Sequence, residues 1–203
     1  MKMNLPNKLT VLRLILVPVI MIVGMLPYIP FLISCFLVAF LFILTAVTDM
    51  LDGKIARKRG LITDFGKFLD PVADKFMVIG TLFVILFKPE FNHIKSLIIF
   101  SLVFIVFREL AVTSMRLVVS TGEGIVIAAN SLGKIKTVSQ IVAIATTLLE
   151  PVVQHVFARA TGLTWDGNIL PLTYLTLIFS IVMTVWSGIS YIKSYWKYLD
   201  PEK

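Results

Sequence analysis

Long apolar runs, separated by short polar breaks, make up most of this 203-residue chain. A helix needs about 20 mostly apolar residues to cross the hydrocarbon core of a membrane. Six runs approach or exceed that length, and they cover residues 10–26, 31–55, 71–87, 96–119, 132–156 and 172–195. The pattern therefore predicts an all-α integral membrane protein with six transmembrane helices. No internal repeat or linker divides the chain, so we expect residues 1–203 to form a single domain.

The two ends of the chain are more polar than the runs between them. Residues 1–9 mix apolar residues with Lys2, Pro6, Asn7 and Lys8, and no signal-peptide cleavage pattern follows. We expect a short N-terminal interfacial helix there, lying at the membrane surface ahead of the first span. Residues 196–203 are expected to form a cytoplasmic tail.

The composition supports a membrane protein and excludes an ordinary soluble domain. Hydrophobic residues make up 58% of the chain and charged residues 15%, whereas soluble domains average about 45–50% and about 25%. Sixteen of the 19 Lys and Arg residues lie at the termini, near residues 56–70 and 117–131, or at the helix ends beside them. The positive-inside rule then predicts a multi-pass protein of the cell membrane with both termini in the cytoplasm. The net charge of +7 indicates anionic lipid headgroups as partners, and no nucleic acid.

Four aspartates gather where the second and third spans are expected to meet the cytoplasm. Asp49, Asp52, Asp70 and Asp74 fall within 26 residues of one another. A carboxylate at the centre of a membrane helix costs about 2.5–3.5 kcal/mol, so such a group needs compensation. At about 100° per residue, the first two share one helix face and the last two share a face of the next helix. Oxygen ligands suit Mg²⁺ or Mn²⁺, and two such divalent cations would balance four negative charges.

Small and basic residues extend this pattern. Gly53 and Ala56 keep the face of Asp49 and Asp52 small, so a ligand can approach the backbone. Arg57 lies one turn beyond Gly53 and can reach a phosphate. The alternative is a set of solvated helix-end carboxylates, whose partners would be Lys54, Lys58, Arg59 and Lys67.

Two segments carry a resemblance to a known family. DMLDGKIAR, which begins at Asp49, and GKFLDPVADK, which begins at Gly66, match the signature D-x-x-D-G-x-x-A-R…G-x-x-x-D-x-x-x-D at every fixed position. The chain thus resembles the CDP-alcohol phosphotransferase family. The resemblance implies six transmembrane helices, usually a homodimer, and an active site on the cytoplasmic side.

The resemblance also implies roles for the residues of the signature. The four aspartates would surround two metal ions, and Asp74 would be the general base. An acceptor hydroxyl would attack the β-phosphorus of CDP-diacylglycerol directly, and CMP would leave. The donor would lie against Asp49, Gly53, Ala56, Arg57 and Gly66.

The start of the chain, NLPNKLTVLR, resembles the members of this family that form phosphatidylglycerophosphate. Asn7 and Thr10 are therefore candidate hydrogen-bonding partners of the cytidine or its phosphates. Alternatively, Thr10 caps the first span and Asn7 belongs to a turn. The two interpretations are compatible.

Cations of the fourth and fifth spans indicate the acceptor. Arg108, Arg116, Lys134 and Lys136 favour an anionic acceptor, best a phosphate monoester. Positive-inside anchoring is the alternative for the two lysines. Glu109 is expected to be an awkward partner for Arg108, because adjacent helical residues point about 100° apart.

The segments RELAVTSMRLV and IAANSLGKIKTVSQIVAI resemble the same members of the family. The implied reaction is transfer of the phosphatidyl group to sn-glycerol 3-phosphate, giving phosphatidylglycerophosphate and CMP. Phosphatidylglycerol, inositol phosphate and serine remain alternative acceptors. A divalent-cation transporter and a metal-dependent membrane phosphatase are the more distant alternatives.

Overall fold

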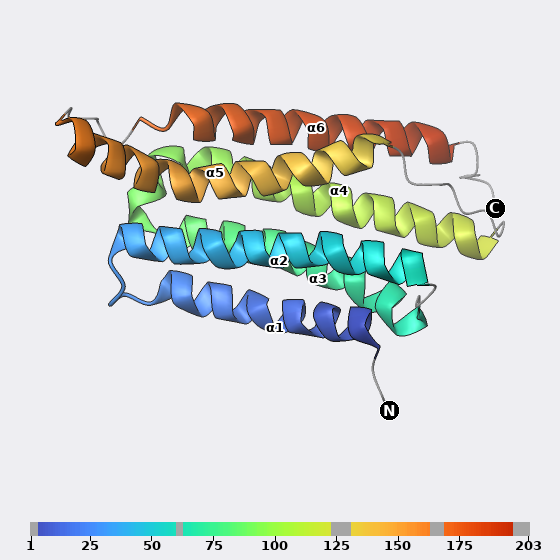
Figure 1. Ribbon diagram of the computed structural model, residues 1–203. Helices are drawn as coiled ribbons and strands as arrows, with labels where there is room; N and C mark the ends of the chain where they lie inside the picture. The colour runs from blue at the N-terminus through green and yellow to red at the C-terminus, as the bar shows by residue number, and fades with distance from the viewer. Residues whose placement is uncertain (1–3, 60–62, 123–130, 163–168, 197–203) are drawn as a thin grey trace.

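The computed structural model describes residues 4–59, 63–122, 131–162 and 169–196. Within these ranges the chain forms six α-helices and one short 3-10 helix, without strands, which confirms the predicted all-α class (Figure 1). The elements are α1 (Leu5–Met25), α2 (Phe31–Arg59), α3 (Asp64–Phe87), η1 (Pro89–Ile94), α4 (Lys95–Gly122), α5 (Ser131–Thr161) and α6 (Pro171–Trp196).

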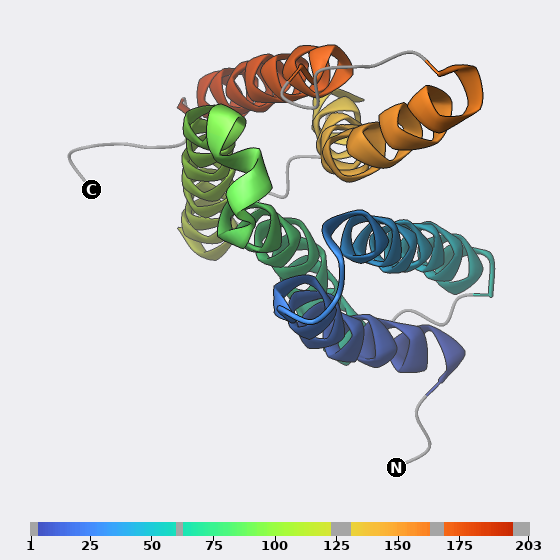
Figure 2. The same cartoon turned by 90° about the vertical axis from the view of Figure 1, so that its left-hand side faces the viewer.

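The six α-helices form a closed ring of neighbours. Helix α1 packs against α2 and α3, α2 against α5, α5 against α6, α6 against α4, and α4 against α3. Viewed towards one end, α1–α3 form one group and α4–α6 the other (Figure 2). Helix α1 begins and α6 ends at the same end of the bundle, where α2 and α4 also end and α3 and α5 begin (Figure 1). We call this end of the bundle the site end.

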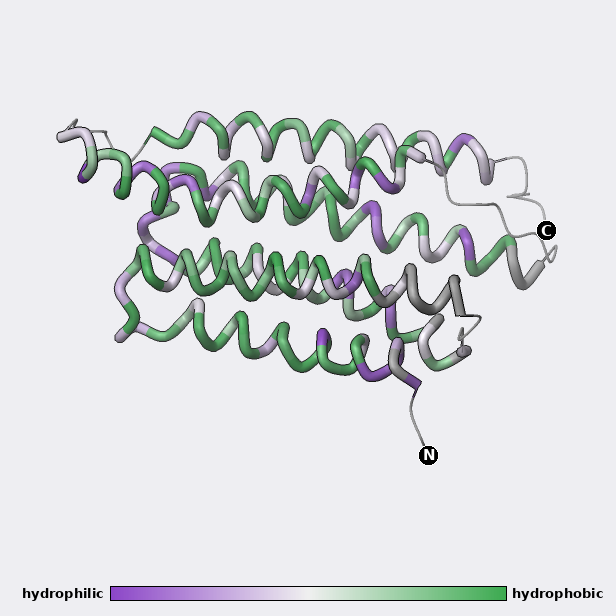
Figure 3. The backbone as a smooth tube through the Cα atoms, in the orientation of Figure 1, coloured by the Kyte–Doolittle hydropathy of each residue, from purple (hydrophilic) through white to green (hydrophobic). Residues whose placement is uncertain are grey.

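Within the described residues, five helices are long and apolar enough to cross a membrane. The spans are Pro6–Met25, Phe31–Leu51, Pro89–Val119, Ser131–Thr161 and Pro171–Trp196. The predicted six-span count is therefore not confirmed, because α3 does not qualify. Asp70, Asp74 and Lys75 lie in the first half of α3 and lower its apolar character, while its second half is apolar (Figure 3).

The first helix differs from the expected interfacial segment followed by a span. The Asn4 side chain accepts a hydrogen bond from the Asn7 N–H at 3.0 Å and so caps α1. Pro6 lies in the first turn, where a missing N–H does not interrupt the helix. Residues 5–25 therefore form one continuous helix, and no separate interfacial helix is seen in residues 4–9; residues 1–3 lie outside the described part.

Helix α3 begins seven residues before the expected start at Pro71. Thr63 caps the helix, and its hydroxyl accepts a hydrogen bond from the Gly66 N–H at 3.1 Å. Pro71 is accommodated inside α3. As a result Asp70 and Asp74 lie one turn apart on the same helix.

The start of α6 is fixed by a carboxylate from α5. Glu150, which is buried, accepts hydrogen bonds from the Leu172 N–H at 3.0 Å and from both the N–H and the hydroxyl of Thr173 at 2.7 Å. The first N–H groups of a helix lack partners within it and carry a partial positive charge. Glu150 therefore ties α5 to α6 at the end of the bundle opposite the site end.

Large apolar side chains cover much of the outer surface of the ring. Examples are Phe107, 68% exposed, Leu175, 66% exposed, and Ile22, 60% exposed. Such a surface is expected where lipid chains surround the protein. Together with the five spans, it shows a multi-pass membrane protein.

Candidate active site

Helix α1 presents a polar face towards α2 and α3. Asn7 and Thr10 lie three residues apart and are both buried. The Thr10 hydroxyl donates a hydrogen bond to Asp70 Oδ1 at 2.6 Å, and the Thr63 hydroxyl donates one to Asn7 Oδ1 at 2.9 Å. Both side chains thus hold the beginning of α3, and Thr10 orients one of the four aspartates.

Arg13 continues this face and was missed in the sequence analysis. Its side chain is fully buried and forms an ion pair with Asp49 on α2, whose side chain is 40% exposed. An arginine within an apolar run, three residues after Thr10, was the signal that could have identified it. Among the described side chains, helix α1 therefore contacts an aspartate on each of the two neighbouring helices.

The aspartates come from two helices, as their spacing predicted. Asp74 interacts electrostatically with Asp49 across the gap between α3 and α2. No hydrogen bond or ion pair to the Asp74 carboxylate is present within the described part of the chain, although Asp74 is partly buried. Asp74 is thus a carboxylate whose oxygens are available for a ligand.

Three predicted site residues of α2 can be placed only by their backbone. Asp52, Ala56 and Arg57 belong to α2, but their side chains lie outside the described part of the structure. Gly53 is partly buried in the same helix. Gly66 is buried at the start of α3, where a methyl group would lie 3.1 Å from Asn7 Oδ1 and 3.9 Å from Asp70 Oδ2.

The metal-binding prediction is consequently open. Among the side chains that the structure describes, no group of three or more His, Cys, Asp or Glu residues is arranged to hold an ion. The expected set includes Asp52, whose side chain is not among them. The donor chemistry of the remaining set fits a hard cation, since Asp49, Asp70 and Asp74 offer only carboxylate oxygens.

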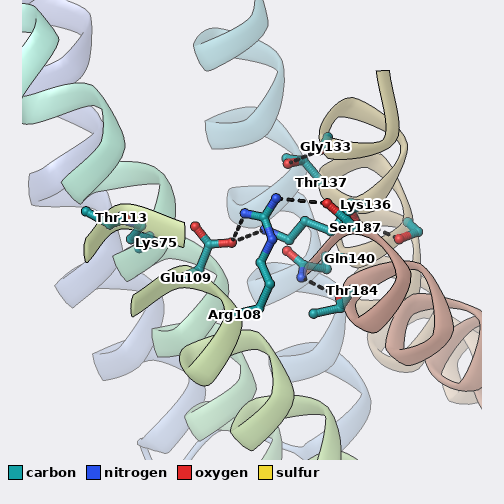
Figure 4. Close-up of polar contacts among 11 residues, drawn as sticks. Lys75, Arg108, Glu109, Thr113, Gly133, Lys136, Thr137, Gln140, Thr184 and Ser187 are labelled. Carbon is teal, nitrogen blue, oxygen red and sulfur yellow. Dashed lines mark hydrogen bonds and ion pairs between the residues drawn. The ribbon is translucent and has the colours of Figure 1, made fainter. Parts of the chain in front are cut away.

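Arg108 on α4 is held by three partners, two of them on α6. Its Nη1 donates to Glu109 Oε1 at 2.8 Å and its Nη2 to the Ser187 hydroxyl at 2.9 Å (Figure 4). The guanidinium carbon also lies 5.2 Å from the centre of the Tyr191 ring. The expectation that Glu109 is an awkward partner was wrong, because the long arginine side chain reaches back to its neighbour.

Glu109 also binds Lys136 on α5, which the sequence predicted to bind the phosphate of the acceptor substrate. Lys136 Nζ donates to Glu109 Oε1 at 2.5 Å, and the Lys136 side chain is only 6% exposed. A single carboxylate oxygen therefore joins two cations from two helices (Figure 4).

A cavity of about 600 Å³ lies beside these groups. Its mostly apolar walls come from α2 and α5, and the lining residues Met50 and Val138 are exposed. Its polar lining residues include one aspartate and three of the four predicted acceptor-binding cations, namely Asp49, Arg108, Arg116 and Lys134. Lys136 is not among the lining residues.

Gly133, at the start of α5, keeps this cavity open towards α6. A methyl group there would lie 3.3 Å from the Tyr191 hydroxyl and 3.9 Å from Arg108 Nη2. Carboxylates from α2 and α3 thus adjoin cations from α4 and α5 at the site end, beside an apolar cavity.

Comparison with known proteins identifies the family of this chain. The CDP-alcohol phosphatidyltransferase family matches residues 3–186. The chain belongs to this family. The phosphatidyltransferase is 37% identical to a protein of Bacillus subtilis over 97% of each chain. It is 34% identical to a protein of Haemophilus influenzae, over 95% of this chain and 94% of that one. It is 35% identical to a protein of Rickettsia bellii, over 96% and 97%.

All three relatives carry the name CDP-diacylglycerol–glycerol-3-phosphate 3-phosphatidyltransferase. The matched range, residues 3–186, spans the aspartate signature and the cations of α4 and α5. The family resemblance expected from the two aspartate segments is thus confirmed for this phosphatidyltransferase.

Proposed function

We propose that this phosphatidyltransferase moves the phosphatidyl group of CDP-diacylglycerol to sn-glycerol 3-phosphate, giving phosphatidylglycerophosphate and CMP. The observation that carries the proposal is the meeting of two kinds of polar group in one place. Asp49 lies at the same cavity as Arg108, Arg116 and Lys134. The names of the three relatives agree with both substrates.

The donor lipid fits the cavity between α2 and α5. Its walls are mostly apolar and include the exposed residues Met50 and Val138, and these walls would receive the acyl chains from the bilayer. The nucleotide would then lie at the site end, near Gly53, Ala56 and Arg57 of α2 and Gly66 of α3. Asn7 and Thr10 support this region through the start of α3 and Asp70.

Asp49, Asp52, Asp70 and Asp74 would hold two divalent cations, Mg²⁺ or Mn²⁺. When bound, the cations would stabilise the negative charge of the pyrophosphate and of the departing CMP. Asp74 is the residue we assign as general base, because its carboxylate has no hydrogen-bond or ion-pair partner in the described structure. It would take the proton of the acceptor hydroxyl during direct attack on the β-phosphorus.

The phosphate of the acceptor would be bound by the cavity cations Arg108, Arg116 and Lys134. Arginine offers paired donors that match phosphate oxygens, and Lys134 adds a point charge. Lys136 was included in this group from the sequence, but it lies deeper and contacts Glu109.

The topology proposed for the membrane places the site end and both termini in the cytoplasm of a cell-membrane protein. The start of α1 and the end of α6 lie at the same end of the bundle, which supports the placement of both termini on one side of the membrane (Figure 1). We further propose one catalytic domain per chain and a homodimeric assembly, as the family resemblance implies. Labelling of cysteines added at the two ends of the chain in sealed vesicles tests the side of the membrane on which the termini lie. Crosslinking in the membrane tests the homodimer.

The reaction is tested with protein purified in detergent, CDP-diacylglycerol and sn-glycerol 3-phosphate. Formation of phosphatidylglycerophosphate and CMP, measured by mass spectrometry, should require both substrates and either Mg²⁺ or Mn²⁺. Chelation should abolish it. Incubation with donor alone should leave the protein mass unchanged, and a phosphatidylated protein would refute direct attack.

A further inference from the structure

The second half of α6 contacts the side chain of Arg108, which comes from α4. Ser187 and Tyr191 lie four residues apart on α6, so they share one face of that helix. Both are buried, and Ser187 is 0% exposed. The Ser187 hydroxyl accepts a hydrogen bond from Arg108 Nη2 at 2.9 Å (Figure 4), and the guanidinium carbon lies 5.2 Å from the centre of the Tyr191 ring. This face of α6 therefore contacts the charged end of Arg108 twice.

Gly188, between these two residues, lets the stem of Arg108 pass close to α6. A methyl group at Gly188 would lie only 3.3 Å from Arg108 Cγ. A glycine permits such an approach to the helix backbone, whereas a larger residue would push the arginine stem away. Arg108 is thus contacted by α6 along its length, from Cγ to the guanidinium.

The other side of the guanidinium is held as well. Arg108 Nη1 donates to Glu109 Oε1 at 2.8 Å, and the same oxygen accepts from Lys136 of α5. A long arginine side chain has many rotamers, so one fixed orientation needs several partners. Contacts from α4, α5 and α6 together supply them.

The guanidinium keeps donors for a further partner. Arginine carries more N–H groups than the contacts with Glu109 and Ser187 use. Its Nε is buried and has no hydrogen-bond partner within the part of the chain that the structure describes. Arg108 and Tyr191 both line the cavity of about 600 Å³. Since paired N–H donors match phosphate oxygens only in the right plane, the orientation of Arg108 decides how well it binds a phosphate there.

We propose that Ser187 and Tyr191 are positioning residues that hold the Arg108 guanidinium in the orientation in which it binds the phosphate of the acceptor. The inference rests on the proposed function, in which Arg108 is one of the cations that bind this phosphate. Ser187 and Tyr191 act through Arg108, and α6 thereby contributes to the affinity for the acceptor.

The test is the rate of CMP release by the purified protein while sn-glycerol 3-phosphate is varied at saturating CDP-diacylglycerol and Mg²⁺. S187A removes the hydrogen-bond acceptor and should raise the KM for sn-glycerol 3-phosphate about tenfold. The KM for CDP-diacylglycerol should change less than about threefold, because the donor does not depend on this contact. Y191L should act in the same direction, whereas Y191F keeps the aromatic ring and should stay within about threefold of the wild type.

A double variant distinguishes positioning from a merely structural role. Without the guanidinium, Ser187 has nothing to position, so R108Q/S187A should have the same KM for sn-glycerol 3-phosphate as R108Q, within about twofold. General loosening of α4 against α6 would instead add to the effect of R108Q and would raise both KM values. The matched control is S180A, which alters another buried serine of α6, seven residues before Ser187. Its kcat and KM values should equal those of the wild type.

Three results would overturn the inference: an unchanged KM for sn-glycerol 3-phosphate in S187A, an S187A effect that persists in the R108Q background, or an equal rise of KM in S180A. Each of them leaves the proposed function intact, because the wild type still uses sn-glycerol 3-phosphate. A wild type that releases CMP with another acceptor but not with sn-glycerol 3-phosphate would refute the proposed function, and the inference with it.

Discussion

Thr10 links the first helix to the aspartate site through one short hydrogen bond. Its hydroxyl donates to Asp70 Oδ1 at 2.6 Å, and the side chain is 2% exposed. Thr10→Val keeps the shape of the side chain but removes the donor. A hydrogen bond to a charged group is worth about 1.5–3 kcal/mol, which corresponds to roughly 10- to 150-fold in rate if it is lost entirely in the transition state. We predict that T10V lowers kcat at least about tenfold.

The cause should be a misoriented Asp70, and the metal dependence reveals it. CMP release would be measured at saturating substrates while the concentration of Mg²⁺ or Mn²⁺ is varied. T10V should require more metal for half-maximal activity, because one expected ligand is less well positioned. Thr10→Ser keeps the hydroxyl and should retain kcat within about threefold.

Two results would refute this reasoning. The first is a T10V variant with wild-type kcat and metal requirement, which would show that the contact with Asp70 has no catalytic consequence. The second is a T10V variant in which only the KM for CDP-diacylglycerol rises. That result would favour the other interpretation, in which Thr10 contacts the nucleotide.

Three further substitutions test other parts of the structure. Asp74→Asn should lower turnover by roughly 10²–10⁴-fold, while binding of CDP-diacylglycerol, measured by calorimetry, persists; substantial residual turnover would exclude Asp74 as the base. Glu150→Gln removes the negative charge and replaces one of the two oxygens that accept from Leu172 and Thr173 by an NH2 group, so it should lower the free energy of unfolding in mixed micelles by about 2 kcal/mol; an unchanged value would argue against this cap. Gly24→Ala places a methyl group against Val84 Cγ1 between α1 and α3 and should cost about 1–3 kcal/mol of stability, and unaltered stability would contradict that close packing.

Much of the helix arrangement could be predicted because its signals are local. Apolar runs and polar breaks placed the ends of α4, α5 and α6 within a few residues, with the largest difference at the end of α5. The beginning of α3 was misplaced, since Pro71 suggested a helix start and the capping role of Thr63 was not recognised. The six-span count is not confirmed at α3, because Asp70, Asp74 and Lys75 make this helix less apolar than the others.

The pairing of side chains between helices could not be predicted from spacing. Asp49 and Asp74 were expected to approach each other, but the insertion of Arg13 beside Asp49 depends on how α1 packs against α2. Likewise, helix-face geometry separated Arg108 from Glu109 by direction alone. The flexible Arg108 side chain nevertheless reaches Glu109 on the same helix, α4. Lys136 reaches the same carboxylate from α5. Such contacts depend on tertiary packing, which one sequence does not reveal.

The central claim is that carboxylates and cations at the site end join CDP-diacylglycerol to an acceptor phosphate monoester. The most direct test is CMP release by the purified protein with CDP-diacylglycerol and Mg²⁺ or Mn²⁺ across a panel of acceptors. The panel comprises sn-glycerol 3-phosphate, inositol 3-phosphate, inositol, serine, phosphatidylglycerol and water. We predict release with sn-glycerol 3-phosphate alone. Equal or faster release with an uncharged acceptor or with water would contradict the assignment of Arg108, Arg116 and Lys134 as the acceptor site.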